Sequence, residues 1–144
     1  MARITVHVDI DAPRDTVWRA AADLGSHAEW MADAESIEFL TESTSGVGTK
    51  MKVATVVGPL KTTDVMEVVE WNEGSSIGVR HEGLITGTGR FELSSVAGGT
   101  RFSWTEELTF PLYLGGGITA RFAKPVLGAI WHRNLRGLKN QLEG

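Results

Sequence analysis

The chain has 144 residues, of which 42% are hydrophobic and 22% are charged, and it contains no cysteine. This length is typical of one domain with its own core, and the lack of cysteine excludes disulfides, thiolate catalysis and cysteine-based zinc sites. The net charge of −4 makes nucleic acid an unfavourable partner, and no apolar run reaches the roughly 20 residues of a transmembrane helix. We therefore expect a single domain over residues 1–144.

The N-terminal part of the chain predicts one strand and two helices. Residues 3–10 alternate apolar and polar side chains, as in a half-buried strand, and no apolar signal-peptide block precedes them, so we expect a cytoplasmic protein. Pro13 fits the start of a helix, where its missing N–H costs nothing. The inward stripe of this helix would consist of Val17, Ala21 and Leu24. A short second helix over 26–31 would carry His27 and Trp30.

Residues 34–110 follow a period of two, which indicates strands. The breaks between the runs contain glycine, proline and asparagine, and such short connections favour antiparallel hairpins. Gly83, Gly87 and Gly89 lie in or beside the fifth of these runs, where glycines let a sheet bend. The predicted strands are 35–42, 49–57, 61–71, 76–82, 84–95 and 100–110.

After a predicted loop over 111–117, a long helix is expected over 118–142. Pro125 removes one helical hydrogen bond, so the helix should kink or begin there. One half of the helix carries Ala123, Val126, Leu127, Ile130, Trp131, Asn134, Leu138 and Leu142. The other half carries the cations Arg121, His132, Arg133, Arg136 and Lys139.

These elements predict an α+β fold with the order strand, two helices, six strands and a long helix. A seven-stranded curved antiparallel sheet with one apolar face needs a cover, and only the last helix is long enough to provide it. A strongly curved sheet against one helix leaves a wedge-shaped gap. Such gaps are where ligands bind, so we expect a hydrophobic cavity between the sheet and the C-terminal helix.

Several short motifs are spread over nearly the whole chain. They begin with the strand, Ala-Pro and Val-Trp pattern over 4–18 and continue with Asp23, Trp30, Gly48, Gly99-Thr100, Leu135 and Leu138-Lys139. In their order and spacing these motifs resemble the START-like, or Bet v 1-like, superfamily (SRPBCC), and within it the bacterial polyketide cyclase/dehydrase and lipid-transport family. The resemblance implies the helix-grip fold and a hydrophobic cavity, but no single reaction, because fold does not determine function.

Three classes of function follow from this interpretation. The leading one is a binding, transport or processing protein for a small hydrophobic ligand such as a lipid, polyketide or isoprenoid. The second is a polyketide cyclase or dehydratase-like enzyme with an acid–base pair in the cavity. The third is a protein-interaction module that uses the cationic face of the last helix, although such a face is commonly only solvated.

Glu106 and His81 are the candidate catalytic residues. Period two places Glu106 on the same face as Phe102, Trp104 and Leu108, which is the apolar face of the last strand. A carboxylate in a cavity is partly desolvated, and its pKa rises as a general acid or base requires. The alternative is that Glu106 reaches water or pairs with an arginine. His81 shares a face with Val79, and a structural histidine is its alternative.

The remaining candidates would bind the ligand. They come from several elements, and core packing is the alternative for each apolar one. Asn134 on the last helix needs a hydrogen-bond partner, which could be a ligand, a water or a strand side chain. The candidate ligand-binding residues are Val79, Gly89, Phe91, Trp104, Leu127, Ile130, Trp131 and Asn134, with Trp30 and Tyr113 at the rim.

We expect neither a metal nor a cofactor. His7, His27, His81 and His132 are not paired at ligand spacing. The glycines at 115–117 precede a helix, as in an anion site, but no Lys-Ser or Lys-Thr follows them. These glycines are interpreted as a flexible lip at the mouth of the cavity.

Overall fold

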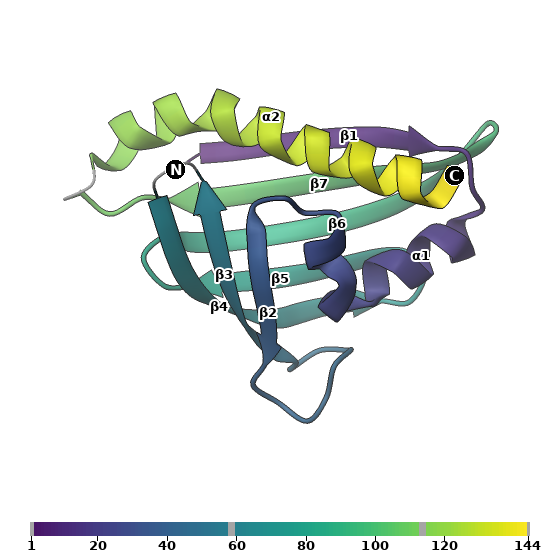
Figure 1. The fold of residues 1–144 in the computed structure, drawn as a ribbon, viewed down its shortest axis with the longest axis horizontal. Coiled ribbons are helices and arrows are strands. Elements are labelled where there is room, and N and C mark those ends of the chain that lie inside the picture. Colours follow the sequence, from purple (N-terminus) through teal and green to yellow (C-terminus); the bar gives the residue numbers. More distant parts are fainter. Residues whose placement is uncertain (1, 58–59, 113–114, 144) are drawn as a thin grey trace.

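The computed structural model describes residues 2–57, 60–112 and 115–143 and contains one antiparallel sheet with three helices. The strands lie in the order β1-β7-β6-β5-β4-β3-β2, so β2 to β7 form successive hairpins and β1 joins the edge beside β7. The elements are β1 (Ala2–Ile10), α1 (Arg14–Ala22), η1 (Leu24–Glu29), β2 (Ala34–Phe39), β3 (Lys50–Val57), β4 (Leu60–Asn72), β5 (Ser76–Glu82), β6 (Thr86–Val96), β7 (Gly99–Thr109) and α2 (Gly116–Glu143). The predicted helix-grip architecture is confirmed, and Figure 1 shows α2 lying along β1 and β7.

The sheet bends where the register between its strands is irregular. In Figure 1, β2 and β3 run at a steep angle to β1 and β7. The register shifts between Ala34 and Ser36 and again between Val68 and Glu70, and such bulges increase twist and bend a strand. Gly87 in β6 has φ +149°, and a Cβ there would lie 1.8 Å from the carbonyl oxygen of Glu107. Only glycine therefore fits this close approach of β6 to β7.

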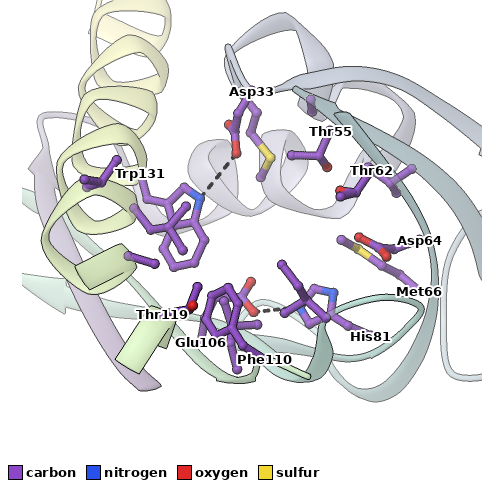
Figure 2. Close-up of a pocket in the computed structure, with 18 of the residues that line it drawn as sticks. Asp33, Thr55, Thr62, Asp64, Met66, His81, Glu106, Phe110, Thr119 and Trp131 are labelled. Carbon is purple, nitrogen blue, oxygen red and sulfur yellow. Dashed lines mark hydrogen bonds and ion pairs between the residues drawn. The ribbon is translucent and has the colours of Figure 1, made fainter. Parts of the chain in front are cut away.

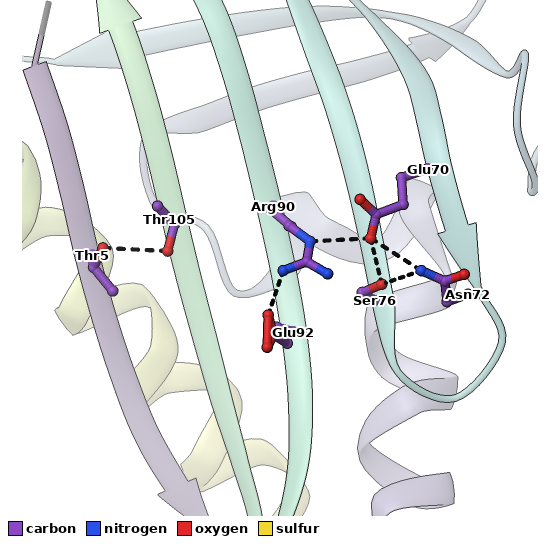
Figure 3. Close-up of polar contacts among 7 residues, drawn as sticks. All are labelled: Thr5, Glu70, Asn72, Ser76, Arg90, Glu92 and Thr105. Atoms are coloured by element: carbon purple, nitrogen blue, oxygen red, sulfur yellow. Dashed lines mark hydrogen bonds and ion pairs between the residues drawn. The ribbon is translucent and has the colours of Figure 1, made fainter.

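The outer face of the sheet is polar, and its charges satisfy one another. Arg90 bonds both Glu70, at 3.0 Å, and Glu92, at 2.5 Å, as Figure 3 shows. Ser76 donates to the same Glu70 carboxylate at 2.6 Å. The three charged side chains are partly exposed, so their ion pairs add little stability, whereas Ser76 is buried.

The helix α2 covers the inner face of the sheet mainly with its C-terminal half. Leu135 and Leu138 are fully buried, and Trp131 is 6% exposed. The expected distribution needs correction at three residues: Leu135, which is not part of the expected apolar half, is buried, whereas Val126 is 53% exposed and Ile130 is only half-buried. Because α2 extends beyond its packing surface, Ile118 and Phe122 near its N-terminus remain exposed.

The start of α2 also differs from expectation. It begins at Gly116, inside the predicted loop, and Pro125 lies within it and does not begin it. A helical proline leaves one carbonyl without its helical N–H partner.

Aromatic side chains fill the interior between η1, the sheet and α2. Trp30, Phe91, Phe102 and Trp104 contact one another with ring centroids 5.0–6.3 Å apart. Trp104 also stacks on Trp131 of α2, with centroids 5.1 Å apart. Trp30 is 6% exposed and belongs to this core, so the expectation that it lies at a rim is wrong.

Candidate functional site

A cavity of about 540 Å³ lies between the inner face of the sheet and the N-terminal half of α2. Its volume is in the range of sites that enclose small molecules. Figure 2 shows Trp131 on the α2 side, facing Thr55, Thr62 and Asp64 across the open space. The apolar lining includes Met31, Ile85, Leu108, Phe110, Phe122, Leu127 and Trp131, and the polar lining includes Asp33, Thr55, Thr62, Asp64, His81, Glu106 and Thr119.

His81 and Glu106 form a buried pair in the wall of this cavity. The Nε2 atom of His81 lies 2.6 Å from Oε2 of Glu106, and the two residues are 8% and 6% exposed. The other carboxylate oxygen of Glu106 accepts a hydrogen bond of 3.0 Å from Nε1 of Trp104. Both oxygens therefore have a donor, which holds the carboxylate in one orientation.

The pair exists because β6 has no side chain where the two residues meet. His81 comes from β5 and Glu106 from β7, with β6 between them. Gly89 on β6 is registered with Val79 on one side and with Glu106 on the other. A Cβ on Gly89 would lie 2.5 Å from Oε1 of Glu106. Gly89 thus provides space for the carboxylate and does not itself supply a binding group.

The pKa of His81 is raised above its ordinary value. Burial on its own would lower this pKa, because it disfavours the charged imidazolium. The negative charge of Glu106 and its hydrogen bond outweigh that effect, and the charge of Asp64 acts in the same direction. The raised pKa favours the protonated imidazole next to the carboxylate, an arrangement that acid–base chemistry can use.

Two further carboxylates line the cavity and were not among the sequence candidates. Burial raises the pKa of Asp64, against the opposing charge of His81 and hydrogen bonds to the carboxylate from Leu84 and Thr62. Its Oδ1 atom is buried without a hydrogen-bond partner among the described residues. The period of two along β4, which places Thr62, Asp64 and Met66 on one face, could have identified this residue.

Asp33 is tied to α2. It accepts hydrogen bonds from Nδ2 of Asn134 at 2.6 Å and from Nε1 of Trp131 at 3.3 Å. The amide oxygen of Asn134 in turn accepts from the backbone N–H of Ala32 at 3.0 Å. Asn134 thus joins α2 to the segment before β2, and its partners are none of the three that the sequence suggested. A contact between residues about 100 positions apart leaves no local signal in the sequence.

A second, smaller cavity of about 80 Å³ lies deeper, beside η1. Val79, Gly89 and Phe91 line it. It shares Met31, Met66, Trp104, His81 and Glu106 with the larger cavity. The His81–Glu106 pair and the two methionines therefore belong to the wall that the two spaces share.

The sequence candidates thus separate into groups. The larger cavity brings together His81, Glu106, Trp104, Leu127 and Trp131. Trp30, Ile130 and Asn134 line neither of the two cavities. Tyr113 lies outside the described residues.

Neither a metal cluster nor a membrane-spanning helix is found in the described part of the chain. No three histidine, aspartate or glutamate side chains among residues 2–57, 60–112 and 115–143 are grouped so as to hold a metal ion. Within the same ranges, no helix combines the length and apolar character needed to cross a membrane.

Solved structures share this fold over nearly the full chain. A protein of Thermus thermophilus has a TM-score of 0.84 at 21% identity, covering 97% of this chain and 96% of its own. A START superfamily protein from Mycobacterium smegmatis has a TM-score of 0.80 at 12% identity, with 99% and 98% covered. The Zhui aromatase/cyclase from Streptomyces sp. R1128 has a TM-score of 0.72 at 19% identity, with 97% and 90% covered. At these identities the likeness shows the fold alone.

The comparison with curated proteins gave no match. The family model described as polyketide cyclase / dehydrase and lipid transport matches residues 1–143. Together with the fold and the cavity between sheet and helix, this match means that the chain belongs to the polyketide cyclase/dehydrase and lipid-transport family.

Proposed function

We propose that this protein binds a small, mainly apolar molecule in the cavity of about 540 Å³. The carrying observation is the composition of the wall, in which aromatic and aliphatic side chains predominate and a few polar groups converge. Apolar walls provide affinity, and a small number of polar groups orients the ligand. Membership of a family that includes polyketide cyclases and lipid carriers supports the same proposal.

Native mass spectrometry of the purified protein and titration with the neutral dye Nile red test the proposal. We expect either a small organic molecule that remains bound under native conditions and dissociates on denaturation, or a saturable fluorescence increase with one dye per chain. Neither a co-purified molecule nor saturable dye binding would contradict it.

Acid–base catalysis on the bound molecule is the second candidate function. The observation in its favour is the buried contact of 2.6 Å between His81 and Glu106 at the cavity wall. A proton could pass between such a pair and a ligand oxygen or carbon, as a cyclisation or dehydration requires. Lipids, polyketides and isoprenoids remain the ligand classes to test.

Replacing Glu106 with glutamine distinguishes the two functions. Glutamine keeps the shape and accepts from Trp104, but it cannot take up a proton at neutral pH. For a catalyst we expect turnover to fall by about 10²–10⁴-fold while Nile red still binds. For a pure binder, affinity for a neutral ligand should change little.

The matched control is Glu107→Gln on the outward face of β7, where Glu107 pairs with Arg3 at 3.9 Å. This control should leave both turnover and binding unchanged. Equal loss of turnover in the two variants would contradict a catalytic role for Glu106.

A further inference from the structure

Among the described residues of the cavity wall, the acidic groups outnumber the basic ones. Three carboxylates line it, on Asp33, Asp64 and Glu106, together with the imidazole of His81. No lysine or arginine is among the described residues of this wall. On the outer face of the same sheet, by contrast, Arg90 pairs with two glutamates (Figure 3).

The neutralisation inside the cavity is incomplete. The Glu106 charge is met by His81, 2.6 Å away. Within the described ranges, neither Asp33 nor Asp64 forms an ion pair with lysine or arginine. The Asp33 carboxylate accepts hydrogen bonds from the neutral donors of Trp131 and Asn134. Three carboxylates thus share one imidazole among the described residues of a space with largely apolar walls, where screening by water is weak.

Three polar side chains of the wall form a cluster on the sheet, whereas Asp33 and Thr119 lie on the side of Trp131 and α2. Asp64, Thr62 and Thr55 come from neighbouring positions on β3 and β4, because Thr55 is registered with Thr62. Figure 2 shows these side chains across the open space from Trp131. A bound molecule whose polar end points toward this cluster would place its apolar body against the aromatic and aliphatic side chains of α2.

We propose that the cavity selects an amphiphile whose polar end donates hydrogen bonds and carries no negative charge, such as an ammonium or a hydroxyl group on an aromatic or aliphatic body. Carboxylates, including fatty-acid anions, are rejected by the like charges of Asp33 and Asp64. This inference rests on the proposed binding function and names the class of ligand.

Three naphthalenes with the same ring and different polar groups test the inference. We choose 2-naphthoate, 2-naphthol and 2-naphthylmethylamine, which are anionic, neutral and cationic at pH 7, and calorimetry would measure each Kd. We expect the amine and the naphthol to bind at least about tenfold more tightly than the naphthoate, since an interaction with one partly buried carboxylate is worth about that factor.

The Asp64→Asn variant should reduce this discrimination. We expect the amine to bind several-fold more weakly and the naphthoate several-fold more tightly, with naphthol within about twofold of the parent. The control is Glu35→Gln, which removes one charge from an exposed ion pair with Lys61 outside the cavity and should preserve the parent order. Circular dichroism would verify that both variants fold.

The outcomes distinguish failure of this inference from failure of the proposed binding function. Naphthoate binding as tightly as the amine to the parent protein would overturn the inference and leave the proposed function intact. Failure of all three compounds and of Nile red to bind would overturn the proposed function and the inference with it. If Asp64→Asn folds poorly, the order of affinities for the parent protein still decides.

Discussion

At the scale of single residues, the contact between His81 and Glu106 depends on a glycine, which has no side chain. Gly89 leaves the space in which the Glu106 carboxylate meets His81. The period of two along β7 was enough to place Glu106 on the inner face. It could not predict the contact with His81, because that contact crosses an intervening strand and depends on the registers of β5, β6 and β7.

We predict that Gly89→Ala separates the pair and lowers the pKa of His81. The new Cβ would lie 2.5 Å from Glu106 Oε1, so the carboxylate must move. Burial then remains the main influence on the pKa of His81, and burial lowers this pKa because it disfavours the charged imidazolium. A titration followed by NMR of the His81 ring would measure the shift, and Gly117→Ala, where a Cβ meets nothing within 4 Å, is the control.

The same change alters stability with a definite sign. A raised folded-state pKa means that the pair stabilises the parent protein below the unfolded-state pKa of about 6.5, and that this contribution is lost as the pH rises through the folded-state value. Gly89→Ala should therefore be more destabilising at pH 5.5 than at pH 8.5. An unchanged His81 titration in this variant would contradict the assigned role of Gly89.

At the scale of elements, α2 performs two tasks with its two halves. The helical period correctly predicted Trp131 and Leu138 as buried, since both pack against the sheet. The same period placed Val126 in the buried stripe, but a helical pattern cannot show where the covered surface ends. Val126 and Phe122 lie beyond it, exposed at 53% and 72%, and both line the cavity.

We predict that this division separates stability from binding. Leu135→Ala removes a fully buried side chain and should lower the free energy of unfolding by about 2–5 kcal/mol. Phe122→Ala should lower it by less than about 0.5 kcal/mol, because the ring is mostly exposed, and should still weaken ligand binding. Urea denaturation and Nile red titration measure the two effects. A large loss of stability in Phe122→Ala would mean that the N-terminal half of α2 is structural.

At the scale of the whole molecule, the order of elements could be predicted from alternation, turn residues and one long amphipathic helix. Each of these signals is local, and together they leave few topologies. The wall of the cavity depends instead on which residues of β3, β4, β5 and β7 face each other. The period of two along β4 places Asp64 on the inner face, but Asp33 precedes β2 and joins the site only through the tertiary structure. The proposed polar character of the ligand rests on those two residues.

The cavity of about 540 Å³ is volume that the side chains of this chain do not fill. Packing atoms into it should therefore be tolerated by the fold and should exclude the ligand. We predict that Leu127→Trp, in the cavity wall, keeps the free energy of unfolding within about 1 kcal/mol of the parent or raises it. The same variant should raise the Kd for Nile red by at least about tenfold.

Ala129→Trp is the matched control, because residue 129 is exposed on the same helix and does not line the cavity. It should leave both the unfolding transition and the Kd close to those of the parent. The two variants place the same indole inside and outside the cavity. An effect on the Kd that both variants share would come from a change in the helix. An effect that only Leu127→Trp shows would come from filling the cavity. Parent-like dye binding by Leu127→Trp would place the ligand elsewhere on the molecule.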